Sequence, residues 1–515
     1  MLGSLHNLFS QTQSKETEAL LSKANFSFSN GYYYEALDLF LELYPLDSLN
    51  AKLNNKIGIC YLYTPYQKHK AQPYLERASQ SININYEVNY FLGDIYHLNY
   101  QFDKAIRSYE KFADLVSVYE KNPNIIQDSK NDAKWKIQIC ENAKAMCNSP
   151  TSDSIINMGE MINSSLDDYG PLISTDEELL MFTSRRSGGV SDKKDAEGKY
   201  NEDIYKSIKT KNTWIKATNI GPPINTNNHD AIVGMAPDGQ LIIIYKEGDL
   251  FYSSANGNNW NKPVAFSTQL NSKFWEPSAS IAADNNAIYF TSDRKGGFGG
   301  SDIWIIKKLP DGEWGKAQNL GPSVNTKYDE DAPFIHPDNK TLYYSSMGHN
   351  TMGGYDIFKS TLNDDNSWSL PVNMKYPINT TGDDIYLVLA GDGKHGYFSS
   401  FRKGGFGDKD IYMIKFQHEE KILSILKGYL MDEKNQPLGA RIIVTDNETG
   451  TQIGIYKSNS SSGKFLVIIP SGKNYNFKVL LNSNEEYNFK DIYIKNQSEF
   501  MMLTDTFLLK EAIRR

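Results

Sequence analysis

A short motif recurs five times between roughly residues 155 and 416 of this chain. Each copy reads Asp-apolar-aromatic, at Asp203-Ile204-Tyr205, Asp249-Leu250-Phe251, Asp302-Ile303-Trp304, Asp356-Ile357-Phe358 and Asp410-Ile411-Tyr412. The successive copies are 46, 53, 54 and 54 residues apart, and apolar strand-like segments and Gly-rich turns lie between them. Self-similarity at this period, with several short strands in each unit, predicts a β-propeller with one sheet per repeat.

A lone strand-like segment precedes the first repeat. Ile155-Ile156-Asn157-Met158-Gly159 matches Ala217–Gly221 and Ala317–Gly321, which we expect to be outermost strands, whereas the last repeat stops at Phe416 without such a segment. Residues 152–159 therefore should complete the last blade and close the ring. This arrangement predicts five blades of four strands, or six if an irregular blade is hidden in the sequence.

An acidic residue follows a recurring Asn by five positions in every repeat: Asp168, Asp230, Glu276, Glu330 and Asp384. Each acid precedes the strand expected to run innermost, so the five carboxylates should lie around one mouth of the central channel. Two roles are open. The favoured one is structural, with each acid accepting hydrogen bonds that join the blades. The alternative is a binding site for a cation or a basic peptide, because carboxylates held close together recruit positive charge.

The Asp of the repeated motif follows a glycine turn, as in Arg294-Lys295-Gly296-Gly297 and Arg402-Lys403-Gly404-Gly405. Gly supplies the positive φ that hairpins need, and the Asp should cap the turn through its side chain. The Arg and Lys residues of these turns should form a basic rim on one face, which we interpret as a solvated surface.

Residues 14–148 change to a helical period. Small residues recur opposite large ones, as in Gly93 and Tyr96 followed by Ala105 and Tyr109. Ala36, Ala71 and Ala105 are 35 and 34 residues apart, which resembles the tetratricopeptide (TPR) repeat. We therefore expect an all-α TPR solenoid, either with a concave groove that takes a peptide or helix, which we favour, or as a rigid spacer.

Residues 419–515 contain short alternating segments separated by Gly, Pro and Asn turns, which predicts an antiparallel β-sandwich. Lys427–Asp432, Gln436–Asp446 and Ser460–Phe465 carry the pattern. The sequences of these segments resemble the carboxypeptidase regulatory-like, transthyretin-related fold, and this resemblance implies a non-catalytic module. The predicted domains are thus 14–148, 150–418 and 419–515.

Motifs of catalysis and cofactor binding are not found in the sequence. There is no HExxH, GxSxG or Gly-rich phosphate loop, and the eight His residues do not occur at metal-ligand spacing. We therefore expect no enzyme, no cofactor and no metal. The net charge of −8 and the lack of a Lys/Arg block argue against nucleic acid as a partner. Three Cys residues are too few for a disulfide framework.

No apolar stretch is long enough to span a membrane. Residues 1–11 are too short and too polar for a complete signal peptide; we interpret them as the tail of one, with the frayed start of a cytoplasmic protein as the alternative.

The order of helical repeats, a TolB- or WD-like propeller and a carboxypeptidase regulatory-like domain resembles a group of Bacteroidetes envelope proteins associated with type IX secretion and gliding. That group usually continues into an OmpA-like peptidoglycan-binding domain. This chain reaches Arg515 without such a module, either because the protein lacks it or because the sequence stops before it, so peptidoglycan binding is not expected. The resemblance implies a periplasmic or outer-membrane-associated protein whose partners are proteins.

The expected function is therefore a non-catalytic scaffold that docks secretion or gliding components through its helical groove and propeller faces. A ligand- or cation-binding sensor that uses the five acids is the alternative. A propeller glycosidase or peptidase is the least favoured interpretation, since neither an Arg cluster with Tyr and Glu nor an added hydrolase domain is found.

Overall fold

The structure is a computed structural model that describes residues 2–64, 67–195, 199–417, 423–470, 472–481, 485–489, 491–494, 501–509 and 513–514. The side chains of residues 2–14, 501, 513 and 514 are not among those described, and neither is His418. Two compact units make up the chain. The first comprises Met1–Ser149 with Lys194–Lys199, and the second comprises Pro150–Lys193 with Tyr200–Arg515.

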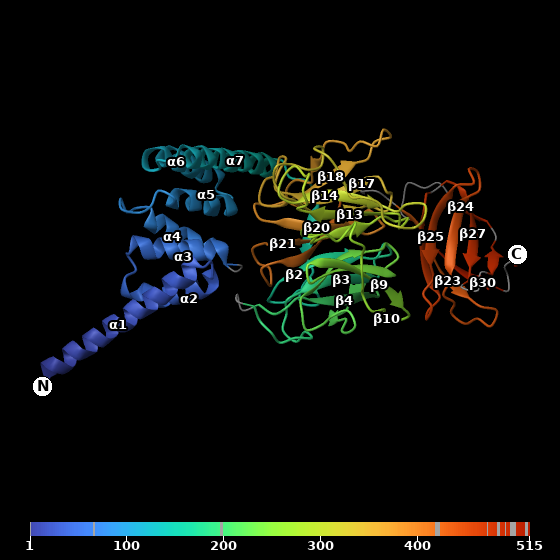
Figure 1. The fold of residues 1–515 in the computed structure, drawn as a ribbon, viewed down its shortest axis with the longest axis horizontal. Helices are drawn as coiled ribbons and strands as arrows, with labels where there is room; N and C mark the ends of the chain where they lie inside the picture. The colour runs from blue at the N-terminus through green and yellow to red at the C-terminus, as the bar shows by residue number, and fades with distance from the viewer. Residues whose placement is uncertain are drawn as a thin grey trace. The chain divides into compact units, whose positions relative to one another are not determined.

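The first unit is helical (Figure 1). Among its described residues there are seven α-helices and two short 3₁₀ segments, at Tyr44–Leu46 and Lys68–Lys70. The α-helices are α1 (Leu2–Ser29), α2 (Tyr33–Leu43), α3 (Ala51–Tyr63), α4 (Ala71–Ala78), α5 (Val88–Leu98), α6 (Phe102–Tyr119) and α7 (Pro123–Asn148). No helix in the described part of the chain is long and apolar enough to cross a membrane.

Small residues let neighbouring helices touch, as the sequence pattern predicts. A Cβ atom on Gly93 of α5 would collide with the Tyr109 ring of α6, and one on Gly58 of α3 would collide with Leu75 of α4. Ala105 is completely buried, and Tyr109 donates a hydrogen bond to Asp94 at 2.7 Å. The small-large pattern therefore encodes the contact between paired helices.

The prediction of an all-α TPR solenoid is nevertheless wrong. The helices range from 8 to 28 residues instead of repeating one length, and the last, α7, packs on α6 without a following partner in the described chain. Helix accounts for only 23% of the chain, and most of the structure is β-sheet. The reason is local: the Ala spacing specifies how two helices touch, whereas a solenoid also requires every pair to have the same length and the same contact with the next pair.

Overpacking at Ala105 tests the helical register. We expect Ala105→Trp to destabilise the helical unit by about 1–3 kcal/mol, because the α5–α6 contact has no room for an indole. Unfolding in urea, followed by the helical circular dichroism signal, measures this effect. Lys111→Trp, on the exposed side of the same helix, is the matched control, and equal stability of both variants and the parent would show that the register is misassigned.

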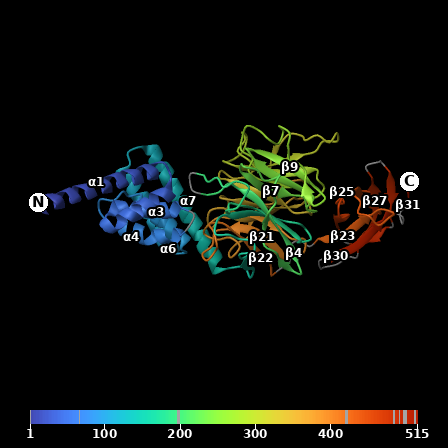
Figure 2. The same ribbon diagram turned by 90° about the horizontal axis from the view of Figure 1, so that it is seen from below.

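Five sheets form the propeller of the second unit (Figures 1 and 2). Blade 1 contains β2 (Asp168–Ile173), β3 (Leu179–Ser184), β4 (Asp203–Thr210), β5 (Thr213–Trp214) and β6 (Thr218–Asn219); blade 2 contains β7 (Asp230–Met235), β8 (Leu241–Lys246), β9 (Asp249–Asn256), β10 (Asn259–Trp260) and β11 (Val264–Ala265). Blade 3 contains β12 (Ala279–Ile281), β13 (Ala287–Ser292), β14 (Asp302–Lys307) and β15 (Gln318–Asn319); blade 4 contains β16 (Glu330–Ile335), β17 (Thr341–Ser346), β18 (Asp356–Thr361) and β19 (Val372–Asn373). Blade 5 contains β20 (Asp384–Leu389), β21 (His395–Ser400), β22 (Asp410–Lys415) and β1 (Ser154–Asn157).

The ring closes as the sequence predicts. The first strands of the blades contact one another in chain order, and β2 of blade 1 also contacts β20 of blade 5. Strand β1 pairs with β22 in antiparallel register, with Ser154 opposite Lys415 and Asn157 opposite Tyr412. The segment before the first repeat is therefore the fourth strand of the last blade, and the described residues form five blades, not six. Blades 1 and 2 depart from the prediction of four strands, since each contains five.

A two-sheet β-sandwich follows the propeller. Its strands are β23 (Ser424–Met431), β24 (Arg441–Asp446), β25 (Gln452–Lys457), β26 (Lys464–Ile469), β27 (Asn474–Leu480), β28 (Glu486–Asn488), β29 (Ile492–Tyr493), β30 (Met501–Leu508) and β31 (Ile513–Arg514). Phe465, Phe477 and Phe507 pack in its core. The sandwich differs from the predicted antiparallel one in a single respect, because β23 and β30 are parallel.

Candidate functional site

The five repeat-equivalent acids are fully buried at the start of the innermost strands or just before them. Asp384 shows the arrangement most completely. One carboxylate oxygen accepts hydrogen bonds from the backbone N–H of Thr380, at 2.6 Å, and from its hydroxyl, at 2.8 Å. The other oxygen accepts from Ser400, at 2.6 Å, and from the guanidinium of Arg402, at 3.0 Å. The acid thus fastens the linker before its blade to the end of the second strand.

The cation beside the acid varies around the ring. Arg186 pairs with Asp168 at 2.5 Å, Arg294 with Glu276 at 2.9 Å and Lys246 with Asp230 at 3.1 Å. Glu330 has no cation in the described structure, since Gly348 occupies the position equivalent to the arginines. Among the residues that the structure describes, only Thr326 and Ser346 donate hydrogen bonds to Glu330.

Burial, which these hydrogen bonds only partly offset, raises the pKa of Glu330 to about 7. The four other acids have a cation as a neighbour, whereas this one faces only hydroxyls and a backbone N–H. Each carboxylate is thus occupied by groups of its own blade and of the linker before it. Among the described residues, each of the five carboxylates therefore already has a hydrogen-bond donor or a cation as its partner.

The direct tie between blades is the Asn five residues before each acid. Its side-chain oxygen accepts from the backbone N–H of one residue on the third strand of the preceding blade, and its amide donates to that residue's carbonyl oxygen. The pairs are Asn163 with Ile411, Asn225 with Ile204, Asn271 with Leu250, Asn325 with Ile303 and Asn379 with Ile357, at 2.7–3.0 Å. In the sequence, this Asn served only to locate the acid that follows it. Its presence in all five repeats was sufficient to predict a structural role for it.

Asp302 and Asp410 cap the glycine turns as predicted, each accepting the backbone N–H of a Phe in the turn at 2.6 Å. The same turns also touch the next blade. A Cβ on Gly299, Gly353 or Gly407 would collide with carbonyl oxygens of the following linker. Glycine at these positions, 54 residues apart, is therefore required by close backbone contact.

The predicted basic rim exists only in part. Arg186, Arg294 and Arg402 fold inward onto the acids and onto linker carbonyls. The arginines therefore complete the blade architecture, and only lysines of these turns remain at the surface, among them Lys295 and Lys403.

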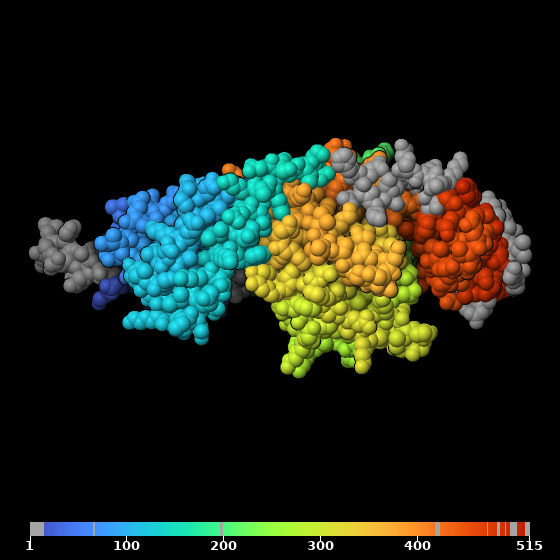
Figure 3. All heavy atoms as spheres, turned by 90° about the horizontal axis from the view of Figure 1, so that it is seen from above, coloured from blue at the N-terminus to red at the C-terminus, as the bar shows by residue number. Residues whose placement is uncertain are grey.

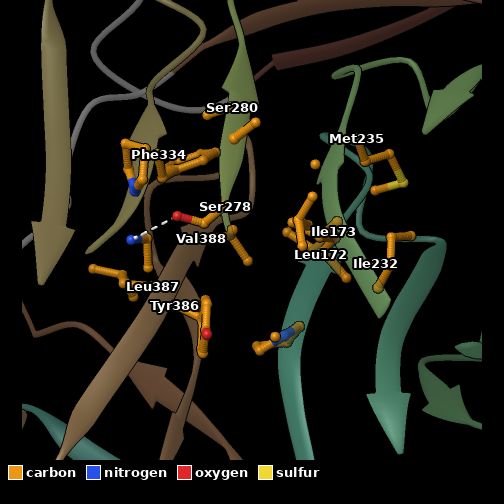
Figure 4. Close-up of a pocket in the computed structure, with 17 residues that line it drawn as sticks. Leu172, Ile173, Ile232, Met235, Ser278, Ser280, Phe334, Tyr386, Leu387 and Val388 are labelled. Atoms are coloured by element: carbon orange, nitrogen blue, oxygen red, sulfur yellow. Dashed lines mark hydrogen bonds between the residues drawn. The ribbon is translucent and has the colours of Figure 1, made fainter. Parts of the chain in front are cut away.

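A small cavity lies in the central channel, lined by residues of all five innermost strands (Figure 4). The space for the centre of a water molecule is about 40 Å³. Its walls are mainly apolar, as at Leu172, Ile232 and Phe334. The Ser278 hydroxyl on the wall is already used, since it donates to the buried Asp331 at 2.5 Å and accepts from the backbone N–H of Ala332 at 3.1 Å. The cavity therefore offers space for little more than water.

A second cluster joins the first and last blades at the hairpins that follow the innermost strands. Glu177 of blade 1 lies near Asp392 and His395 of blade 5, and one ligand atom of each lies within 4.8 Å of the others. The carboxylates of Asp392, 2.8 Å from His395 Nδ1, and of Glu177, 3.4 Å from it, raise the pKa of His395 to about 9. Lys209 pairs with Glu177 at 2.7 Å. At neutral pH a protonated imidazole and an ammonium already balance these carboxylates. The sequence did not predict this cluster.

The β-sandwich contacts the same end of the blades. Lys464 of β26 donates to Asp176 at 2.8 Å and to Glu178 at 2.9 Å, while Lys427 of β23 pairs with Asp176 at 3.2 Å. Although burial opposes ionisation, these lysines keep the pKa of Asp176 below its ordinary value. Asn459 adds a hydrogen bond to the carbonyl oxygen of Gly257 in blade 2 at 2.9 Å. At this end of the propeller, polar groups are therefore already bound by the sandwich of the same unit.

Removal of the Lys464 amine tests this contact. We expect Lys464→Ala to destabilise the second unit by about 1.5–3 kcal/mol, because the buried Asp176 loses a charge-assisted hydrogen bond. Thermal unfolding of the full chain at low salt measures the effect. Lys478→Ala is the matched control, since Lys478 pairs with Glu486 inside the sandwich at 3.2 Å. A loss no greater than that of the control would show that the contact contributes nothing to stability.

The opposite end of the blades presents large apolar side chains. Trp275 and Phe298 are each 50% exposed and Phe406 is 48% exposed. Trp275 lies in the linker before β12, and the two Phe residues lie in glycine turns between the second and third strands. These loops share one face because the strands they join are antiparallel and in register. The turns are held by Asp302 and Asp410, so the aromatic rings sit on ordered backbone.

No family model matches the chain, and no curated protein matches its sequence. Solved structures resemble it at low identity. An α-L-arabinofuranosidase from Lactobacillus brevis is 14% identical, with a TM-score of 0.33 over 50% of this chain and 94% of its own. An endo-arabinase from Bacteroides thetaiotaomicron is 12% identical, with a TM-score of 0.33 over 52% and 99%. The WD40 repeats of RRP9 are 9% identical, with a TM-score of 0.29 over 52% and 98%.

Proposed function

We propose that this protein is a non-catalytic scaffold that binds a protein partner through the propeller face bearing Trp275, Phe298 and Phe406. The exposure of these three rings carries the proposal. Half-exposed aromatic side chains on ordered loops are the groups that dominate binding energy at protein interfaces, because they bury much apolar area at little entropic cost.

The arrangement of the second unit supports the choice of face. The sandwich engages the hairpins at the other end of the blades through Lys427, Lys464 and Asn459. The buried acids support a structural use of the repeat, because, as at Asp384, each carboxylate accepts hydrogen bonds from its own linker, and four of the five also pair with a cation of their blade. On the sequence resemblance, we place the scaffold in the cell envelope and expect its partners among secretion or gliding components.

Site-directed photo-crosslinking in cells that naturally produce the protein tests this function. A photoreactive residue replaces Phe298 or Phe406, and cross-linked proteins are identified by mass spectrometry. Leu370 is the control position, since it is an 80% exposed apolar residue between β18 and β19. We expect one protein to cross-link at both Phe positions and not at Leu370. The same proteins at all three positions, or none at the Phe positions, would reject the proposal.

A further inference from the structure

Three exposed lysines lie in the loops that carry two of these aromatic rings or in the linker that contacts those loops. Lys273 and Trp275 come from the linker before β12, Lys295 and Phe298 from the β13–β14 loop, and Lys327 from the linker before β16. All five side chains are exposed. We call this set the basic-aromatic patch. In the space-filling view, residues near 300 are yellow-green to yellow and lie on the outer surface (Figure 3).

Backbone contacts bring the three segments together. The backbone N–H of Trp275 donates to Asp293 at 2.8 Å, which joins the first linker to the β13–β14 loop. Gly299, beside Phe298, is so close to the carbonyl oxygens of Thr326 and Tyr328 that a Cβ would collide with them. The three segments are therefore adjacent in the fold although the residues of the patch span more than fifty positions.

The charge of the patch is positive, against the trend of a chain with net charge −8. Lys273, Lys295 and Lys327 make no ion pair with any side chain that the structure describes. The nearby carboxylates of Asp293 and Asp329 accept backbone N–H groups, at 2.8 Å each. Lys273 and Lys327 lie over the rings of Phe274 and Tyr328, with the ammonium 5.5 and 5.0 Å from the ring centres. A neutral N–H does not cancel the charge of a carboxylate, so three ammonium groups and two carboxylates leave a net charge of +1 beside apolar surface.

We infer that the basic-aromatic patch binds an acidic segment of the protein partner in which apolar side chains alternate with carboxylates. This inference rests on the proposed function and names the chemistry of the partner. Carboxylates would pair with the three ammonium groups, and apolar side chains would cover Trp275 and Phe298. A nucleic acid or an anionic membrane fits less well, because the acidic remainder of the chain repels a large polyanion whereas a short acidic segment reaches only the patch.

Fluorescence polarisation with a labelled peptide that alternates glutamate with leucine tests the inference on the full chain. We expect saturable binding that weakens at high salt. Replacing Lys273, Lys295 and Lys327 by Glu should weaken binding by about tenfold or more. Trp275→Ser with Phe298→Ser should weaken it by a similar factor, which a purely ionic contact would not do. Unchanged thermal unfolding of each variant shows that the blade stays folded.

The matched control replaces three exposed lysines outside the patch, Lys211, Lys262 and Lys316, by Glu. It should leave the affinity unchanged. Equal weakening by patch and control variants, indifference to the aromatic replacements, or no peptide binding would overturn the inference. Patch-dependent binding of single-stranded RNA or anionic vesicles in place of the peptide would also overturn it. A partner cross-linked at Phe298 without peptide binding would leave the scaffold function standing and reject only the acidic-segment assignment.

Discussion

Deletion of residues 152–159 should lower the melting temperature of the propeller by roughly 10–20 °C relative to that of the parent protein. The deletion removes the fourth strand of blade 5, and with it the pairing of Ser154–Asn157 with β22 and the packing of Ile155. It also removes Asn157, which donates to Asp410 at 2.8 Å. Together these losses amount to roughly 5 kcal/mol. Calorimetry of the full chain measures the shift.

A synthetic peptide with the sequence of residues 150–160 provides the control. Added to the deletion variant, it should restore much of the lost thermal stability, because an unpaired edge strand accepts a strand of the right sequence. A scrambled peptide should not. Unchanged melting after the deletion, or equal rescue by both peptides, would mean that β1 does not close the ring.

Asp384→Asn and Glu330→Gln should change stability in opposite directions at pH 8, although the two acids occupy equivalent positions. Asp384→Asn places an amide against the Arg402 guanidinium, which can only donate, and leaves that buried charge uncompensated. We expect a loss of about 3–5 kcal/mol. Glu330 faces two hydroxyls, of Thr326 and Ser346, which can rotate to accept hydrogen bonds from a Gln amide. We expect Glu330→Gln to stabilise the fold by up to about 3 kcal/mol.

The pH dependence follows from the raised pKa of Glu330. Burial raises the folded-state pKa of Glu330 to about 7 from its ordinary value of 4.5, so the folded state binds the proton more tightly than the unfolded chain does. Its contribution is fully present below about pH 4.5 and is lost as the pH rises through 7. Between pH 5 and pH 8, urea unfolding should show a larger loss of stability in the parent than in Glu330→Gln, which keeps the other titrating groups, among them Asp238. The same dependence in both proteins, or a stabilising Asp384→Asn, would contradict this account.

The sequence predicted the propeller well because the constraint is repetitive. Each copy of the motif must fill the same place in a blade, so turn, strand and acid recur at a nearly constant spacing that one chain displays five times. The closing strand was predictable for the same reason, since Asn157 and Gly159 fill positions that Asn219 and Gly221 fill in blade 1. The role of the Asn at each linker could have been predicted from its recurrence, whereas its bidentate bond to the preceding blade required the structure.

The helical unit shows where such reasoning fails. Gly93 and Ala105 predict a contact between two helices, and the structure contains that contact. The lengths of the helices and the partner of α7 depend on packing that no short pattern records. The cluster of Glu177, Asp392 and His395 was missed for a different reason. Glu177 lies more than two hundred residues before Asp392 and His395 in the chain, and only closure of the ring brings their hairpins together.

The pairing of β1 with β22 also determines how the propeller responds to mechanical load. The chain enters the ring at Ser154 and leaves it after Lys415, and these two residues lie opposite each other at one end of an antiparallel pair. A tensile force applied through the flanking segments would act on that end first and break the hydrogen bonds one after another, as in a zipper. Such a geometry yields at lower force than one in which all the bonds are sheared together. The closure strand would therefore be the first part of the ring to open in a chain under tension.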